Sequence, residues 1–241
     1  MLDADADSSV IGVAFFPARR GLPRGVCGEG AFGRTTVAVV CSGSGIRSAT
    51  VTKGHAMSEQ PAPYDMYTAA TFDEAGIPVL LIGDSASNDV FGNKTSLPVT
   101  VDQLLPLVRA VSGAARQALA IADLPFGSYE ASAEQCFHTA VRFMKEAGAH
   151  AVKPEGGEEM VPEHVGAEIT RSVAVPTVGI GARNGCDAQV LVWQDMAGPR
   201  TGQLPRFVKR YADVHGVLRE VAQNFAADVA KGTFPAPEHT F

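Results

Sequence analysis

The sequence predicts an α/β fold of the (β/α)8 TIM-barrel type, because short apolar runs alternate with helical patterns and end on charged residues. Apolar runs of this length, bounded by turn residues, are typical of buried parallel strands. Three consecutive runs have this form: Val79–Gly83 before Asp84, Leu119–Ala122 before Asp123, and Ala149–Val152 before Lys153. A barrel of parallel strands arranges its strand ends around one mouth, so we expect these three side chains to meet there.

The composition describes a globular protein that binds neither nucleic acid nor membrane. Of the 241 residues, 46% are hydrophobic and 19% are charged, and the length suits a single α/β barrel. The formal net charge of −6 argues against a nucleic-acid partner. No apolar run approaches the ~20 residues that a membrane helix needs, and the acidic Met1–Asp7 segment is unlike a signal peptide. We therefore expect a cytoplasmic protein.

The helices of the predicted barrel have recognisable ends. Met66–Ala75 reads as a helix closed by Gly76, directly before the first of the three strands. Thr100 and Ser132 each begin a capping box, with Gln three residues later, and predict helices that extend to about Ser112 and Ala147. Helix and strand thus alternate as in successive βα units.

The two ends of the chain are predicted to differ. Pro176–Gly181 and Val190–Trp193 read as further short strands, and 205–231 reads as an amphipathic helix with a break at Gly216. Residues 1–63 lack a regular pattern, although Val10–Phe16 and Val37–Cys41 could be short strands, and are interpreted as an irregular extension before a barrel domain that spans 64–241. The prolines within Gln60–Pro63 argue against a strand there.

Two of the strand-end residues are carboxylates that could bind a metal ion. Asp84 and Asp123 would supply hard oxygen ligands, which suit Mg²⁺ and leave positions for water and an anionic substrate. The alternative is that each aspartate caps the turn or helix that follows it. The spacing of the residues does not decide between these interpretations.

Other polar residues near the third strand also have two interpretations. Lys153 could hold a substrate carboxylate or an enolate oxygen, or it could extend to solvent from a strand end. Glu155 and Glu159 are a candidate metal ligand and a candidate base, or they belong to an acidic surface turn. His150, within an apolar strand, is interpreted as a core histidine with satisfied hydrogen bonds.

Several long segments resemble one enzyme family. They occur in the family's order and are Val79–Ser85, Ala122–Tyr129, Gly148–Gly157, Pro176–Ala182, Cys186–Trp193, Arg206–Tyr211 and Phe234–Phe241. From Tyr64 to Phe241 the chain is similar to the ketopantoate hydroxymethyltransferases (3-methyl-2-oxobutanoate hydroxymethyltransferases), and most similar to those of actinobacteria. The resemblance implies a (β/α)8 barrel that assembles into a homodecamer.

The resemblance also implies roles for six residues. Asp84, Asp123 and Glu155 match the family's Mg²⁺-associated carboxylates. The 2-oxo acid would be held by Asp84, Ser85, Asp123 and Lys153, and Glu159 matches the general base. In the implied reaction, Mg²⁺ binds 3-methyl-2-oxobutanoate and Glu159 removes its C3 proton. The resulting enolate attacks the one-carbon unit of 5,10-methylenetetrahydrofolate, the co-substrate.

The sequence departs from the family at one junction. Glu158 and Glu159 are adjacent, where family members carry two further βα units between the corresponding positions. We therefore expect a contracted barrel that lacks the fifth and sixth strands, with the first strand also in question. An alternative function follows: a catalytically impaired family member that acts in metal binding or oligomer interactions. A third reading, a related Mg²⁺-dependent barrel of the phosphoenolpyruvate mutase and isocitrate lyase group, fits the Lys153–Gly157 motif less well.

Overall fold

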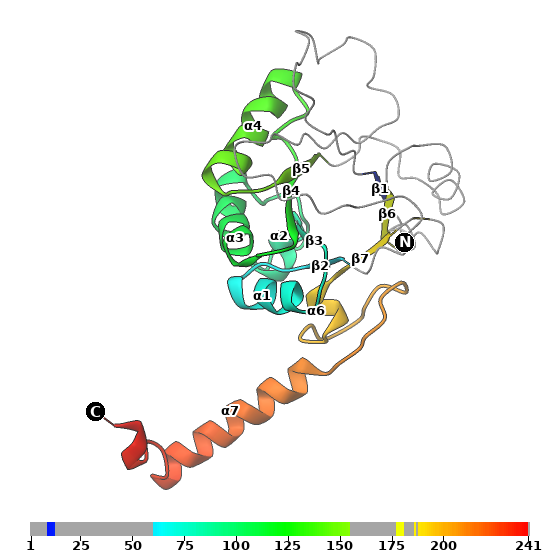
Figure 1. The fold of residues 1–241 in the computed structure, drawn as a ribbon. Coiled ribbons are helices and arrows are strands. Elements are labelled where there is room, and N and C mark those ends of the chain that lie inside the picture. Colours follow the sequence, from blue (N-terminus) through cyan, green and yellow to red (C-terminus); the bar gives the residue numbers. More distant parts are fainter. Residues whose placement is uncertain (1–8, 13–59, 155–176, 181–185, 187, 241) are drawn as a thin grey trace. The chain divides into compact units, whose positions relative to one another are not determined.

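The computed structural model describes residues 9–12, 60–154, 177–180, 186 and 188–240 (Figure 1). The chain divides into two compact units, Met1–Leu191 and Val192–Phe241, which we describe separately. Glu155 and Glu159 lie outside the described residues, as does the junction at Glu158.

Three strands of the first unit form a parallel sheet. They are β3 (Val79–Ile82), β4 (Leu119–Leu124) and β5 (Ala151–Pro154), with β4 in the centre. Val79 pairs with Leu119, and Asp123 pairs with Lys153, so the charged ends of the strands are in register. Every residue of β3 and β4 is buried, as expected for parallel strands covered on both faces. The sheet confirms the predicted order of strands.

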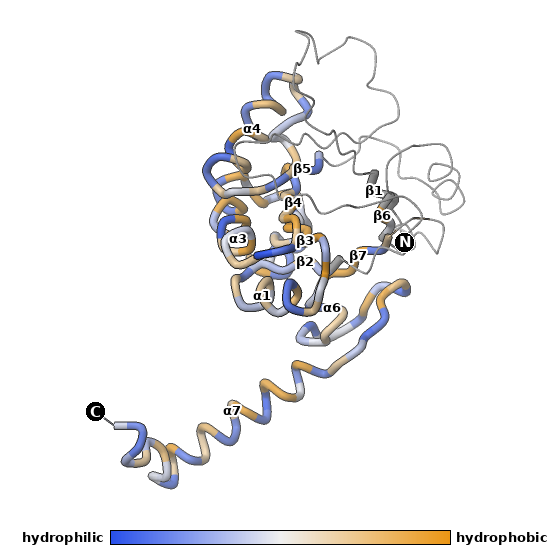
Figure 2. The backbone as a smooth tube through the Cα atoms, viewed as in Figure 1, coloured by the Kyte–Doolittle hydropathy of each residue, from blue (hydrophilic) through white to orange (hydrophobic). Residues whose placement is uncertain are grey.

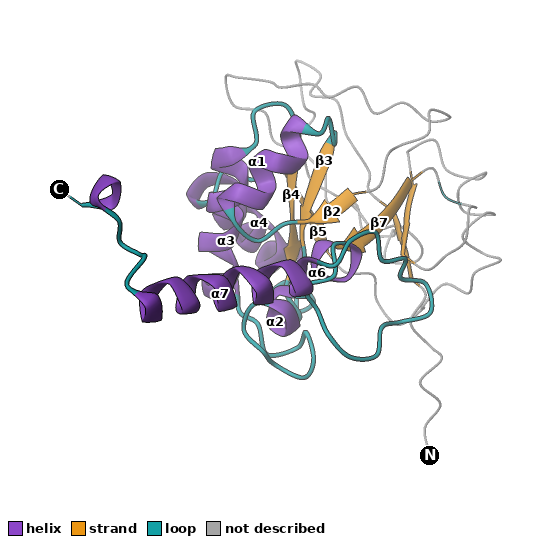
Figure 3. Ribbon diagram, turned by 90° about the horizontal axis from the view of Figure 1, so that it is seen from below, coloured by secondary structure: helices purple, strands orange, loops and turns teal. Residues whose placement is uncertain are grey.

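Three helices pack together beside this sheet (Figure 3). They are α1 (Met66–Glu74), α3 (Val101–Ala114) and α4 (Ala133–Glu146), and a short helix α2 (Ala86–Asp89) follows β3. The capping box predicted at Thr100 is complete, because its side chain accepts from Gln103 N–H while the Gln103 side chain accepts from Thr100 N–H. At Ser132 only the serine side of the box forms, since the Gln135 side chain accepts from Ala131 N–H instead.

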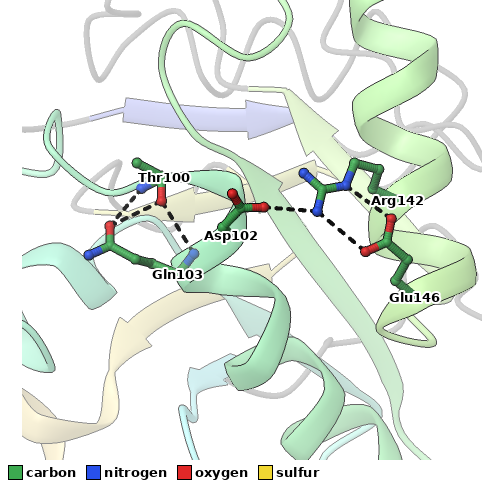
Figure 4. A network of polar contacts seen from close by, with 5 residues as sticks. All are labelled: Thr100, Asp102, Gln103, Arg142 and Glu146. Atoms are coloured by element: carbon green, nitrogen blue, oxygen red, sulfur yellow. Dashed lines mark hydrogen bonds and ion pairs between the residues drawn. The ribbon is translucent and has the colours of Figure 1, made fainter.

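Hydrogen bonds from two helices hold the ends of β4 and α4. The buried carboxylate of Asp73, in the last turn of α1, accepts from the backbone N–H groups of residues 116, 117 and 118, directly before β4. Figure 4 shows a second network, in which Arg142 of α4 binds Asp102 of α3 and Glu146 of its own helix. The first set of bonds ties α1 to the start of β4, and the second ties α4 to α3.

Four other strands form a second sheet of mixed direction. The strands are, in spatial order, β1 (Ser9–Gly12), β6 (Thr177–Ile180), β7 (Ala188–Val192) and β2 (Gln60–Ala62). β6 and β7 are parallel, whereas β1 pairs antiparallel to β6, with Ser9 opposite Ile180. At the other edge, β2 lies beside β3.

This second sheet corrects the predicted fold in two places. The α/β class with parallel strands is confirmed, but the strands of the described residues form two sheets and no closed barrel. β2 forms at Gln60–Ala62 in spite of Pro61, and a proline is tolerated there because β2 is an edge strand of its sheet. β1 lies in the segment predicted to be irregular, so that segment contributes a strand.

The second unit contains the C-terminal helices α6 (Trp193–Met196) and α7 (Val214–Lys231) and the 3-10 turn η2 (Pro237–His239). The predicted helix start at 205 is wrong, because α7 begins after Asp213, whose carboxylate accepts from Gly216 N–H. Gly216 therefore lies in the first turn instead of breaking the helix. Apolar and polar residues alternate along α7 (Figure 2). No helix of the described segments has the length and apolarity that crossing a bilayer requires.

Candidate active site

The ends of β4 and β5 bring a carboxylate and an ammonium group together inside the protein. Lys153 Nζ lies 2.9 Å from Asp123 Oδ1, and the two residues are 1% and 3% exposed. Parallel pairing of residue 123 with 153 places both side chains at the same level of the sheet. Burying an unpaired charge costs folding free energy. The Asp123–Lys153 contact offsets this cost for two charged groups that lie at the buried ends of their strands.

The end of β3 contributes to the same location. The backbone N–H of Asp84 donates to Asp123 Oδ2 at 3.2 Å, which joins the first two predicted strand ends directly. Gly83 provides the space for this contact: a Cβ atom there would lie 2.8 Å from Ser85 Oγ and 3.3 Å from Asp123 Oδ2. The Ser85 hydroxyl and the Asp123 carboxylate therefore border the same small space above Gly83.

Tyr64 is a site residue that the sequence reasoning did not assign. It follows β2, is buried, and its Oη lies 2.6 Å from Ser85 Oγ. Burial, together with the negative charges of Asp89, Asp123 and Asp84, raises the pKa of Tyr64 well above its usual value, so the phenol keeps its proton. The sequence offers no clear signal for it, because the prolines before Tyr64 argue against the strand β2 that positions it.

The structure bears on the interpretations of Lys153, His150 and Asp123. Lys153 does not extend to solvent, since it is buried against Asp123. His150 is half-buried, its imidazole Nδ1 accepts from Ala120 N–H at 3.0 Å, and its backbone N–H donates to Ala120 O, so the histidine supports the strand as expected but is not fully within the core. Asp123 bonds to two neighbouring strand ends, because Oδ1 pairs with Lys153 of β5 and Oδ2 accepts from the Asp84 N–H at the end of β3.

The described residues form part of the predicted site. Asp84, Ser85, Asp123 and Lys153 come together at neighbouring strand ends, while Glu155 and Glu159 fall outside the described residues. Within the described segments no three His, Cys, Asp or Glu residues group as a metal-binding cluster. The group combines a buried ammonium, a hydroxyl and two carboxylates. Such a set can bind an anionic substrate and can offer oxygen ligands to a cation.

Comparisons with known proteins identify the family of the chain. The sequence matches the ketopantoate hydroxymethyltransferase family over residues 50–161 and 158–237. A 3-methyl-2-oxobutanoate hydroxymethyltransferase of Nocardioides sp. is 52% identical over 240 residues, covering 74% of this chain and 81% of its own. The enzymes of the same name from Saccharopolyspora erythraea and Mycobacterium marinum are 49% and 45% identical over 240 residues. Both alignments cover 74% of this chain. They cover 82% of the Saccharopolyspora enzyme and 81% of the Mycobacterium enzyme.

The chain is an α/β protein with a parallel sheet, and its candidate site is at the carboxyl ends of β3, β4 and β5. The chain belongs to the ketopantoate hydroxymethyltransferase family. The family match begins at residue 50, within the segment interpreted as an extension.

Proposed function

We propose that the protein transfers a hydroxymethyl group from 5,10-methylenetetrahydrofolate to 3-methyl-2-oxobutanoate, which yields 2-dehydropantoate in pantothenate biosynthesis. The observation that carries this proposal is the buried Asp123–Lys153 pair, joined to Asp84 and Ser85 at the ends of three parallel strands. The relatives named above, with 45–52% identity, support the same reaction.

Lys153 and Ser85 are the proposed binding groups for the 2-oxo acid. Lys153 is a fixed positive charge in a site with little water, where its attraction for a carboxylate or enolate oxygen is stronger than at the surface. The Ser85 hydroxyl is a neutral donor on the other side of Asp123, across the space above Gly83. Together they would orient the substrate so that its C3 proton can be removed.

The donor set also fits Mg²⁺. Asp84 and Asp123 carry oxygen donors at neighbouring strand ends, which the bond from Asp84 N–H to Asp123 Oδ2 joins, and Mg²⁺ is commonly bound through one or two carboxylates with water and substrate oxygens. Asp84, Asp123 and, from its place in the sequence, Glu155 are the residues that would hold the ion. When bound, Mg²⁺ supplies a Lewis acid that increases the acidity of the C3 proton.

Glu159 is the proposed base that accepts the C3 proton. A carboxylate can do this when it lies within hydrogen-bonding reach of that proton and the charge left on the substrate is stabilised, here by the Lys153 ammonium. No covalent bond between protein and substrate is needed. A cytoplasmic location and a homo-oligomer, a decamer in the family, are also proposed on the resemblance.

We further propose that the chain is a contracted family member. The family match falls into two segments that meet at residues 158–161, next to the Glu158–Glu159 junction. In addition, the alignment with the Nocardioides enzyme has 240 positions but includes only 74% of the 241 residues of this chain. The alignment therefore contains gaps on the side of this chain. The same contraction motivates the alternative, a family member that binds metal or other subunits without catalysis.

Exchange of the C3 proton tests the function and separates the two alternatives. We expect the protein to exchange the C3 proton of 3-methyl-2-oxobutanoate for deuterium in D₂O, as followed by NMR, only when Mg²⁺ is present. Glu159→Gln should abolish exchange, while Glu158→Gln, next to it, serves as the matched control. No exchange by a folded sample would favour the impaired alternative, and equal loss in both variants would refute the role of Glu159.

A further inference from the structure

Tyr64 and Ser85 form a hydrogen-bonded pair that connects the ends of two strands. Tyr64 follows β2 and Ser85 follows β3, and the two hydroxyl oxygens are 2.6 Å apart. The Tyr64 side chain is 4% exposed, so its hydroxyl cannot turn to bulk water for a partner. A contact this short, between a buried phenol and a half-buried hydroxyl, fixes the position of both oxygens.

The direction of this hydrogen bond follows from the chemistry of the two groups. Either oxygen could donate, but a phenol is the stronger acid and therefore the better donor of the two. The phenol also keeps its proton, because burial and nearby carboxylates raise the pKa of Tyr64. When Tyr64 donates to Ser85 Oγ, the proton of Ser85 is left to point elsewhere.

The surroundings of Ser85 show where that proton can go. Ser85 is the N-cap residue of α2, yet its side chain makes no capping hydrogen bond. The oxygen borders the space above Gly83 that it shares with Asp123 Oδ2. Without the bond from Tyr64, Ser85 could rotate and donate to one of the nearby carboxylates, which would compete with an anionic substrate for the same hydroxyl.

We propose that Tyr64 is a positioning residue that holds Ser85 as a hydrogen-bond donor to the carboxylate of the 2-oxo acid. This role rests on the proposed function. It predicts that Tyr64 affects substrate binding through Ser85, and that it takes no part in removal of the C3 proton. The consequence is a loss of affinity with little change in the rate of the bound complex.

The test is a double-mutant cycle on the full chain with Mg²⁺ present. Tyr64→Phe removes only the phenolic oxygen and should raise the Kd of 3-methyl-2-oxobutanoate, measured by calorimetry, by about tenfold. The C3 exchange rate at saturating substrate should stay within about twofold. Ser85→Ala should weaken binding at least as much, and the double variant should bind no more weakly than Ser85→Ala alone.

Tyr67→Phe is the matched control, since Tyr67 is 77% exposed on α1, and it should bind as the unmodified protein does. Thermal melting of each variant identifies general loss of fold. Unchanged affinity in Tyr64→Phe, or additive effects in the double variant, would overturn the role of Tyr64 alone. Failure of the unmodified protein to bind or exchange the 2-oxo acid would overturn the proposed function, and this role with it.

Discussion

The two sheets of the first unit differ in how their strands are obtained. The three-stranded sheet is built from one continuous stretch, 79–154, in which each strand is parallel to the next. The four-stranded sheet combines strands from residues 9–12, 60–62 and 177–192, and its β1 is antiparallel. The described site residues lie at the ends of strands of the three-stranded sheet, except Tyr64, which follows β2 at an edge of the four-stranded sheet. The comparison indicates that the local order of strands, more than closure of a barrel, brings this part of the site together.

The largest expected effect is on the Asp123–Lys153 pair of the three-stranded sheet. Lys153→Met leaves a buried carboxylate without its cation, so we expect the free energy of unfolding to fall by about 3–5 kcal/mol. C3 exchange should fall at least ~100-fold, because the positive charge that stabilises the substrate oxygen is lost. Denaturant unfolding and the NMR exchange assay measure the two effects.

The double variant Asp123→Asn/Lys153→Met is the control for this prediction. It removes both buried charges and should recover part of the lost stability, while exchange stays low because both groups are gone. If Lys153→Met exchanged at the unmodified rate, the assignment of the site to the three-stranded sheet would be wrong.

Much of the three-stranded sheet could be predicted from sequence because its signals are local. Asp84, Asp123 and Lys153 each come at the end of an apolar run that is bounded by turn residues. Thr100 marks the start of its helix with a capping box. The confirmed strand order needs only pairing between successive strands. By contrast, the Tyr64–Ser85 contact depends on β2, which two prolines had argued against.

The four-stranded sheet could not be predicted, because its pairings connect residues that are distant in sequence. Ser9–Gly12 carries no local pattern that specifies Thr177–Ile180 as its partner or the antiparallel direction. The start of α7 was also missed: residues 205–213 contain apolar positions at helical spacing, but Asp213 is the residue that caps the helix. Local patterns identify an element more reliably than its partner.

The next expected effect concerns β1, the strand that covers an edge of β6. Consecutive N–H groups of an edge strand point alternately toward and away from its partner, so proline at Val10 and at Ile11 should have unequal effects. One of Val10→Pro and Ile11→Pro should lower the free energy of unfolding by about 1–2 kcal/mol through a lost ladder bond, and the other much less.

Each proline variant is the control for the other, and denaturant unfolding compares them. Equal, negligible effects would show that β1 contributes nothing to the stability of the second sheet. C3 exchange should change little in the folded variants. The described site residues lie at the ends of strands of the three-stranded sheet, and Tyr64 follows β2, at the opposite edge of the four-stranded sheet from β1. A large loss of exchange would instead show that the two sheets depend on each other for the site.

The smallest expected effect is on the surface network between α3 and α4 (Figure 4). Arg142 binds Asp102 at 2.8 Å and Glu146 at 3.0 Å, and the hydrogen bond from Arg142 lowers the pKa of Glu146. A carboxyl with a lowered pKa in the folded state adds stability above its unfolded pKa, and that stability is lost as the pH falls through the folded pKa. Arg142→Met should therefore lower the Tm slightly at neutral pH and not at acid pH. Lys145→Met, on the same helix outside the network, is the control. The difference in Tm should shrink at high salt because the pairs are exposed.

A difference that persists at acid pH would show that the Arg142 stem, and not its charge, supports the packing of α4 on α3.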